Sequence, residues 1–587
     1  MLYGPETARI LHEDRFFRGN YEELAVDTSL NNNYSPLYWF SDTVFQQSLD
    51  NIGMATKPLL FQFPEKIGAR LGRNVFDLYM YQPEDITYFD TRSPYSKLEF
   101  IQGTLGEGVF EGEFNRNIKK WWNAGIAYRR ISANKQIGGQ RTQQALVHNG
   151  LKLYTHLQTT NNKYHLFANF LNNNHKFVET GGVKLGPKPD KEYLFEYLSD
   201  TINLTAATGR EIRNSFHIGQ TYALFGENLK LFYNLDRRRQ TDRFVDTNVD
   251  LEGNPGFYRN KTNYSPDETR DKTIFTELEN TGGITGNQKH YYYQAYIKNR
   301  HVNYELFTPD SLLSETINQT FIGGEAELKV NEKIKTSFGG EYKIADEYRA
   351  EAQIDFLFLG FRQSRLNYAP SLTQQLYYGN HHNWNNDFDN ISADRSAAWI
   401  HGTLFHNYLR LELATTSIRN YVFYNQIEIP EQTSQVQRLQ TAVLDHKFNL
   451  GKFNWENLVA YTNTSGDYIR VPDWAVRSRM FYSGYIFKKA LYGQVGVEAN
   501  YRSSYFADAY SPAIQQFYLQ NSFSVENYPV LDVFIAADIK SVNVFLKLAH
   551  ANEGLNGSNF LPGYFSTPYY PGMRRSFIFG VKWQFFD

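Results

Sequence analysis

Apolar and polar residues alternate with a period of two along most of this chain, from about residue 97 to its last residue. Successive side chains of a β-strand point to opposite faces, so this alternation predicts strands with one apolar and one polar face. The clearest case is segment 491–502. Its apolar face carries Leu491, Val495, Val497, Ala499 and Tyr501, and its polar face carries Gln494, Glu498, Asn500 and Arg502.

The polar faces carry many charges, as segments 322–330 and 401–413 also show. A packed protein core would not accept so many charged side chains, and we find no amphipathic helical pattern that would cover a sheet face. No segment approaches the roughly 18 consecutive apolar residues that a membrane-spanning helix needs. The sequence therefore predicts an all-β fold, a transmembrane antiparallel β-barrel with one face in lipid and the other in water.

The composition supports a wall between lipid and water. Aromatic residues make up 16% of the 587 residues, with 43 Tyr and 45 Phe, yet the mean hydropathy is −0.54. Aromatic girdles at two membrane interfaces around a polar lumen account for both values. The formal net charge of −2 provides no basic field, so nucleic acid is not an expected partner. Cysteine is absent, which excludes disulfides and thiolate catalysis.

The links between the expected strands fall into two classes. Short turns are predicted at 160–163, 226–228, 331–333 and 450–452, and long polar links at 173–210, 236–272, 364–396, 503–525 and 551–573. Outer-membrane barrels have short periplasmic turns and long extracellular loops, and we assign the links accordingly. With about 10 residues per spanning strand, residues 95–587 are expected to form one barrel of roughly 14 to 18 strands.

The last segment of the chain is strongly aromatic on one face. That face carries Phe577, Phe579, Val581, Trp583 and Phe585. The segment resembles the terminal strand by which outer-membrane proteins are recognised for insertion, which implies the barrel-assembly machinery as a partner; an ordinary C-terminal strand is the alternative. An open sheet edge in lipid would leave backbone groups unsatisfied, so we expect this strand to pair with the first one.

Residues 1–94 are irregular and contain few alternations. Apolar runs such as Leu59–Phe61 need a surface to bury them, and large barrels are known to hold plugging segments. We therefore expect the segment to lie in the lumen or at the periplasmic mouth, while a loose periplasmic lead-in remains the alternative. The start at Met1 has neither the basic residues nor the apolar stretch of a signal peptide, so an exported protein of this sequence would be the mature or trimmed form.

Two sequence motifs in this region carry a resemblance to a known family. They are Leu49-Asp-Asn-Ile-Gly-Met-Ala-Thr-Lys-Pro-Leu59 and Tyr88-Phe-Asp-Thr-Arg-Ser-Pro-Tyr95, followed by Leu98–Gly103 and Trp122–Arg129. Over about residues 27–180 the chain resembles the Bacteroidota-type putative porins. The resemblance implies an outer-membrane β-barrel and a location in the cell outer membrane, in contact with its lipid.

Charged residues on the expected inner faces would line a polar lumen. The candidates are Glu325, Glu327, Arg410, Glu412, Arg477, Arg479, Glu498 and Arg502. The leading prediction is a porin-like channel for passive or weakly selective diffusion of small polar solutes, with selectivity set by opposed charges. The alternative is a plugged barrel that acts as an accessory or scaffold subunit of a larger outer-membrane complex, with other outer-membrane proteins as partners.

No enzyme motif is present, and we expect neither catalysis nor a cofactor. Asp246, Asn248 and Asp250 offer oxygen ligands at the alternating spacing of a calcium loop. Leu251 stands where an EF-hand needs glycine, and Phe257 stands where it needs a bidentate acid. An ordinary polar loop is therefore the stronger interpretation of this segment.

Overall fold

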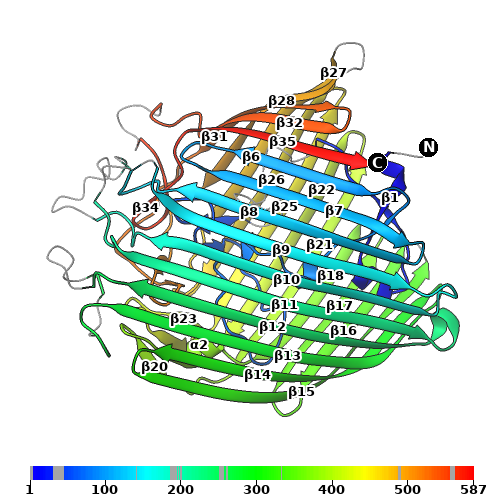
Figure 1. The fold of residues 1–587 in the computed structure, drawn as a ribbon, viewed down its shortest axis with the longest axis horizontal. Coiled ribbons are helices and arrows are strands. Elements are labelled where there is room, and N and C mark those ends of the chain that lie inside the picture. The colour runs from blue at the N-terminus through cyan, green and yellow to red at the C-terminus, as the bar shows by residue number, and fades with distance from the viewer. Residues whose placement is uncertain are drawn as a thin grey trace.

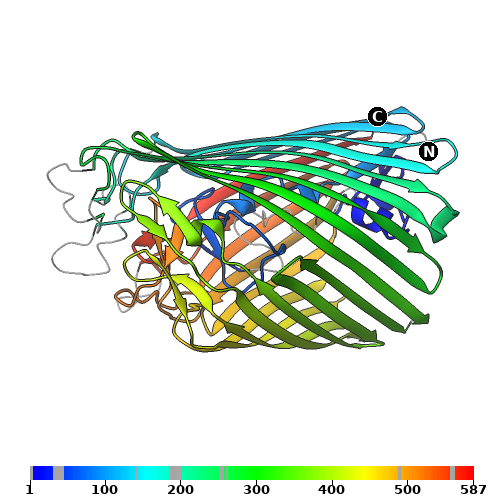
Figure 2. The same ribbon diagram turned by 90° about the horizontal axis from the view of Figure 1, so that it is seen from below.

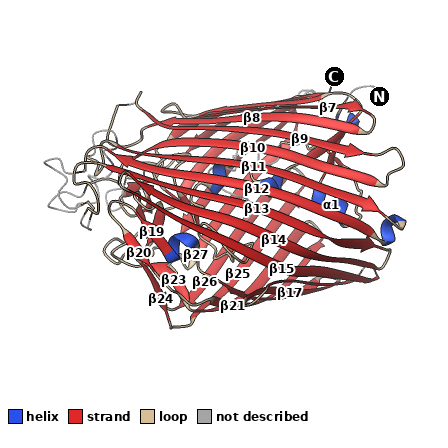
Figure 3. Ribbon diagram, turned by 60° about the horizontal axis from the view of Figure 1, so that its bottom comes forward, coloured by secondary structure: helices blue, strands red, loops and turns tan. Residues whose placement is uncertain are grey.

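The computed structural model describes residues 4–30, 45–140, 142–184, 195, 197, 201–249, 257–258, 262–331, 333–486, 491–555 and 562–586. Its main feature is a closed antiparallel barrel of 22 strands, in which every strand hydrogen-bonds to its neighbours in the wall (Figure 1). Strands make up nearly all of the regular structure (Figure 3). Within the described ranges, no helix has the length and apolar composition required to cross a membrane.

The wall strands follow one another in sequence order around the barrel. They are β6 (Tyr95–Gln102), β7 (Gly108–Lys119), β8 (Trp122–Asn134), β9 (Gln144–Gln158), β10 (Tyr164–Glu179), β11 (Ala207–Ala223), β12 (Lys230–Asp246), β13 (Thr269–Asn287), β14 (Tyr291–Thr308), β15 (Ser311–Asn331), β16 (Ile334–Lys343), β17 (Glu347–Phe356), β18 (Leu359–Tyr368), β21 (Ile391–Leu404), β22 (Asn407–Arg419), β25 (Gln437–Leu450), β26 (Phe453–Ser465), β27 (Trp474–Ile486), β28 (Leu491–Arg502), β31 (Val530–Ile539), β32 (Val542–Ala549) and β35 (Ser576–Phe586).

The barrel closes where the last strand meets the first. β35 pairs antiparallel with β6, with Phe586 opposite Tyr95 and Trp583 opposite Leu98. No wall strand is left with a free edge, which satisfies the backbone as lipid requires. The predicted fold class, a closed antiparallel barrel, is confirmed.

The predicted number of strands is wrong, because 22 strands exceed the 14 to 18 expected. Two links on the long-loop side, 309–310 and 344–346, are as short as periplasmic turns, so more strands fit into the chain. The predicted loops 173–210 and 236–272 are also too long. Strands β10 to β13 extend into both of them, since β10 reaches Glu179 and β12 reaches Asp246.

The two ends of the barrel differ as predicted. Connections at one end are short, such as 120–121, 405–406, 451–452 and 540–541, and those at the other end include 180–206, 369–390, 503–529 and 550–575. The long connections contain small hairpins and one helix: β19 (Leu376–Tyr378) with β20 (Asn383–Asn385), β23 (Tyr421–Tyr424) with β24 (Pro430–Thr433), β29 (Ala509–Ser511) with β30 (Gln516–Tyr518), β33 (Phe565–Thr567) with β34 (Tyr570–Pro571), and α2 (Leu372–Gln375).

The alternation of the wall strands separates an outer apolar face from an inner polar one. On β28, Val495 and Val497 are each 50% exposed on the outside, whereas the inward Glu498 is fully covered. Such apolar exposure over a whole wall is expected only where lipid covers it. The faces predicted for segment 491–502 match this arrangement.

The chain before β6 forms short elements that lie inside the ring of strands (Figure 2). They are β1 (Ala8–Leu11), α1 (Glu13–Phe17), β2 (Leu24–Ala25), β3 (Gln46–Ser48), β4 (Thr56–Pro58) and β5 (Tyr88–Thr91), with single 3₁₀ turns at Pro5–Thr7, Asp77–Tyr79 and Pro83–Asp85. A further 3₁₀ turn, η6 (Gly226–Asn228), joins β11 to β12 at the short-turn end. We call residues 4–30 and 45–94 the inner segment.

Candidate functional site

The inner segment meets one side of the wall through an apolar core. Leu49, Phe76 and Tyr79 are at most 1% exposed and pack in one cluster with inward wall side chains such as Leu146 and Phe177. The rings of Phe76 and Phe177 lie 4.4 Å apart. Burying a large apolar side chain completely stabilises by roughly 1.5–3 kcal/mol, so this cluster alone holds the segment firmly.

Two backbone contacts fix the segment more closely against this side. Gly53 has φ +82°, and an added Cβ there would lie 2.4 Å from a methyl carbon of Leu146, so only glycine allows this approach. A ring nitrogen of His175 lies 2.9 Å from the Gly53 carbonyl oxygen. Further along, the side-chain amide of Asn173 both accepts from the backbone N–H of Tyr81, at 2.9 Å, and donates to its carbonyl, at 3.1 Å.

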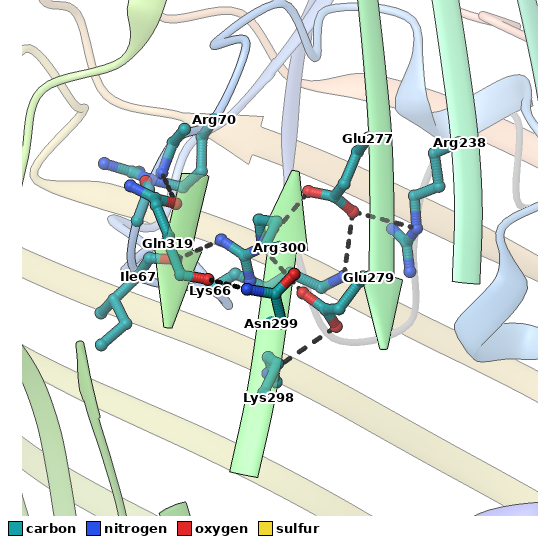
Figure 4. Close-up of polar contacts among 12 residues, drawn as sticks. Lys66, Ile67, Arg70, Arg238, Glu277, Glu279, Lys298, Asn299, Arg300 and Gln319 are labelled. Carbon is teal, nitrogen blue, oxygen red and sulfur yellow. Dashed lines mark hydrogen bonds and ion pairs between the residues drawn. The ribbon is translucent and has the colours of Figure 1, made fainter. Parts of the chain in front are cut away.

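The opposite side of the segment meets the wall through polar groups, centred on Arg300 of β14 (Figure 4). The Arg300 side chain is fully buried and donates to the carbonyl of Ile67 at 2.6 Å and to the carboxylate of Glu279 at 2.7 Å. Its guanidinium carbon lies 4.6 Å from the ring centre of Phe321. A buried charge needs such partners, so Arg300 ties the backbone of the segment to the wall.

Gly68 and Ala69, the two residues after Ile67, also bond to the wall. We call residues 66–73, which carry these contacts, the dock. The backbone N–H of Gly68 donates to Glu347 at 2.8 Å, and that of Ala69 donates to Gln319 at 2.9 Å. Gly68 has φ +84°, and an added Cβ would lie within 2.8 Å of Gln319, Phe321 and Arg300. The wall therefore accepts this loop only with glycine at position 68.

Ion pairs extend the polar contact along β11 to β13. Asp77 pairs with Arg213 at 2.6 Å, Glu84 pairs with Arg238, and Lys66 lies 3.8 Å from Glu277. These pairs join residues far apart in sequence across the lumen, and partial burial strengthens their attraction relative to surface pairs. The segment therefore contacts the wall through charged as well as apolar side chains, and Ile67 and Leu71 of the dock are themselves buried in apolar clusters with the wall.

The long connections cover the dock from the other end. The N–H groups of Leu372 and Thr373 donate to the carbonyls of Arg70 and Leu71, at 2.8 and 3.2 Å. The side chain of Gln516 donates to the carbonyl of Gly72 at 2.9 Å. Lumenal wall, inner segment and long connections therefore form one continuous set of contacts.

The residues predicted to line a pore face the lumen, but they form three separate groups. Glu325 and Glu327 on β15 both face Arg18 of the inner segment, at 2.8 and 3.9 Å. Arg410 and Glu412 pair with each other on β22 at 3.1 Å. The third group, on β27 and β28, contains Arg477, Arg479, Glu498 and Arg502, with Arg479 opposite Glu498 and also paired to Glu456. The eight residues therefore do not form one ring of opposed charges.

The other two sets of predicted residues lie on the outer face of the last strand and at the extracellular end of the barrel. In the terminal strand, Phe577, Phe579 and Trp583 are 70%, 41% and 43% exposed on the outer face, where Phe585 also points. Of the calcium candidates, Asp246 ends β12 and accepts hydrogen bonds from the Tyr258 hydroxyl and the Asn248 N–H. Asp250 lies outside the described residues. Among those described, no three His, Asp or Glu side chains form a group that could hold a metal.

Sequence reasoning missed the wall residues that hold the segment. Arg213, Arg238, Glu277, Glu279 and Arg300 are not among the predicted sites. A signal was present in the sequence. Glu277 and Glu279 lie two residues apart, as do Lys298 and Arg300, so period-two counting would assign the two members of each pair to one face of their strand. Arg238 fell within a link expected to be a loop.

Solved structures similar to this one are outer-membrane receptors and transporters. The FrpB iron transporter from Neisseria meningitidis (F3-3 variant) has a TM-score of 0.60 at 10% identity, with 84% of this chain and 81% of that chain covered. The siderophore receptor PiuA from Acinetobacter baumannii has 0.59 at 11% identity, with 84% and 81% covered. FpvA from P. aeruginosa, bound to heterologous pyoverdines, has 0.60 at 10% identity, with 84% and 72% covered. At such low identity these likenesses show the fold alone.

The 22-strand barrel that this chain shares with these neighbours overturns the leading functional prediction. Outer-membrane transporters of 22 strands have a plugged lumen, unlike the open channels of smaller porins. The expectation of passive diffusion through a polar lumen is therefore wrong for this chain, and its inner segment accounts for the difference. The charged inner faces indicated a lumen lined by water, but part of that charge pairs with the segment instead.

Sequence comparison identifies the family of this chain and supports its location. No curated protein matches it. The barrel architecture and the family match locate the protein in the outer membrane, so the short turns face the periplasm. The model of the family described as putative porin matches residues 11–587, nearly the whole chain, and the chain belongs to that family.

Proposed function

We propose that this protein is a plugged outer-membrane barrel that acts as an accessory or scaffold subunit of a larger outer-membrane complex. The observation that carries the proposal is the dock of residues 66–73, where the buried Arg300 and the backbone of Ile67 and Gly68 fix the inner segment across the lumen. A segment that buried ion pairs and an apolar core hold inside the lumen obstructs passive diffusion through it.

The long connections add to the closure of the barrel. They fold into hairpins that bond to the segment, as Gln516 does to Gly72, so they cover the lumen at its extracellular end. The iron and siderophore named for the neighbouring structures are said of those proteins and are not carried over to this chain.

Conductance and native mass test the two parts of the proposal separately. Purified full-length protein in a planar bilayer should show no steady conductance above that of the bare membrane. In mildly solubilised native membranes the protein should migrate in a complex well above its own 68.4 kDa. A steady ohmic conductance would reject the plug, and migration as a single barrel would reject the subunit role.

A further inference from the structure

The outer face of β10 to β13 is strongly basic. These four strands lie side by side in the wall (Figure 1). The exposed apolar side chains of Phe170, Phe216, Leu231 and Leu278 mark their outer face, and every second residue from each of these shares it. The cations on this face are Lys176, Arg210, Arg237, Arg239, Arg243, Arg270 and Lys272.

The carboxylates of the same strands all lie on the inner face. Glu211, Asp242 and Glu277 are examples, and none of the three is more than 4% exposed. No carboxylate faces outward on β10 to β13, which the structure describes from end to end. The next strand, β14, has one outward carboxylate, Glu305, and it lies opposite Ile274 rather than a cation. The outer face of these four strands therefore supplies cations but no counter-ions.

Four of these cations lie directly side by side. Lys176 is opposite Arg210, which is opposite Arg243. Arg243 is in turn opposite Lys272. Neighbouring strands are about 4.8 Å apart, so the four side chains span about 14 Å across the sheet. Like charges directly opposite each other destabilise a sheet, so this arrangement favours an anion above it. We call Lys176, Arg210, Arg243 and Lys272 the basic row.

Among the described residues, none supplies an anion to the basic row. Lys176 and Arg243 are exposed and make no hydrogen bond or ion pair with any of them. Arg210 donates to the side-chain oxygen of Asn174 at 3.0 Å, and that amide is uncharged. The ammonium group of Lys272 lies 4.4 Å from the centre of an aromatic ring. The charges of the row are therefore available to an external anion.

The basic row lies just above the apolar belt of the wall. Leu231 is the first outward residue at the periplasmic end of β12 and is 45% exposed, so the belt begins there. Arg243 follows 12 residues later, about 40 Å along the strand and about 30 Å along the barrel axis at a tilt of about 40°. The apolar band of such barrels is about 25 Å tall, so the row lies at the level of the outer-leaflet headgroups. Arg237 and Arg239 lie below the row, and long arginine side chains extend toward the headgroups from such positions.

We propose that the basic row binds the phosphate groups of an outer-leaflet lipid. Arginine pairs bidentately with phosphate, and clusters of Lys and Arg at a membrane surface attract anionic headgroups. The length of the row favours a headgroup with more than one phosphate, and the acyl chains lie along the apolar outer residues below it, such as Phe170 and Phe216. This inference goes beyond the proposed subunit role, and its test depends on neither conductance nor association with other proteins.

The probe is diphosphorylated lipid A, titrated into full-length protein in a neutral detergent, with bound lipid counted by native mass spectrometry. It should bind, and lipid A with the same acyl chains but no phosphates should not. Equal binding of the two lipids, or no binding of either, would overturn the proposal. Inorganic phosphate is the second probe and separates a lipid from a free anion. It should not displace the lipid at equal concentration, and displacement would refute the assignment to a lipid.

Variants localise the binding to the row. Arg243→Gln should weaken it about fivefold, and Arg210→Gln combined with Arg243→Gln about twentyfold, because each removes a cation from the anionic headgroup. The control Arg438→Gln removes an exposed cation at the extracellular end of β25, across the barrel, and should have no effect. An equal loss of affinity in the control would show that overall charge, and not the row, attracts the lipid.

Thermal unfolding in lipid-free detergent adds a second readout. Arg243→Gln should be at least as stable as wild type there, because the substitution relieves repulsion between opposed cations. Added diphosphorylated lipid A should then raise the unfolding temperature of wild type more than that of the variant. A loss of stability in Arg243→Gln without lipid would show that this arginine serves the fold itself, and would contradict the proposed site.

Discussion

The guanidinium of Arg300 on β14 donates a 2.6 Å hydrogen bond to the backbone carbonyl of Ile67, which lies 233 residues earlier in the chain. The contact joins the barrel wall to the inner segment and is fully buried. The same guanidinium pairs with Glu279, so one side chain both neutralises a buried carboxylate and holds the segment.

Arg300→Met should release the dock and leave Glu277 and Glu279 short of positive charge. Breaking a buried pair by removing one partner costs about 3–5 kcal/mol. We expect faster cleavage near residues 66–73 by an added protease, together with a lower unfolding midpoint. Arg270→Met is the matched control, because Arg270 has a 57% exposed side chain at the extracellular end, and it should behave like wild type. Equal cleavage of both variants would show that Arg300 does not hold the segment.

Gly68→Ala should weaken the dock through packing. An added methyl would meet Gln319, Phe321 and Arg300 at 2.6 to 2.8 Å, and the residue would also keep a positive φ. Gly451→Ala has a positive φ of 63° but no atom within 4 Å of its added carbon, so it isolates the backbone strain of about 1–3 kcal/mol. Chemical denaturation should therefore show a larger loss of stability for Gly68→Ala than for Gly451→Ala. Similar losses would assign the whole effect to backbone conformation.

The wall was largely predictable from sequence, while the dock was not. In segment 491–502, each residue's face follows from its own position, since a strand alternates and lipid selects one face. The contact between Arg300 and Ile67 has no such local signature, because it depends on how a long, irregular segment crosses the lumen. The number of strands was underestimated for a related reason. The links at 309–310 and 344–346 lie on the side where long loops were expected, and nothing in their sequence indicates that side.

Val497→Arg should destabilise the barrel by about 2–4 kcal/mol if the residue lies near the bilayer midplane. Val497 is 50% exposed on the outer face, where arginine would enter lipid. Val497→Leu keeps the face apolar and should be tolerated. Unfolding in lipid vesicles by denaturant compares the two, and equal stability would invalidate the lipid-facing assignment of β28.

Removal of Trp583–Asp587 should prevent assembly while leaving synthesis intact. These residues supply pairs that close the barrel, with Trp583 opposite Leu98 and Phe585 opposite Ser96. Without them β6 keeps unpaired backbone groups along much of its length, which lipid does not satisfy. Surface labelling of intact cells measures the outcome, and normal surface abundance of the shortened protein would contradict the role given to this end.

Deletion of residues 4–90 should convert a closed barrel into a conducting one. The wall begins at Tyr95 and closes on β35, so the 22 strands keep all their neighbours after the deletion. The lumen would lose its apolar plug core around Phe76 and its paired charges at Lys66, Asp77 and Glu84. Arg213, Arg238 and Glu277 would then face water, and single-channel recordings should show steady ion conductance that the full-length protein lacks. If the deleted protein assembles but stays closed, the long connections that contain Leu372 and Gln516 seal the barrel by themselves, and the inner segment is not its plug.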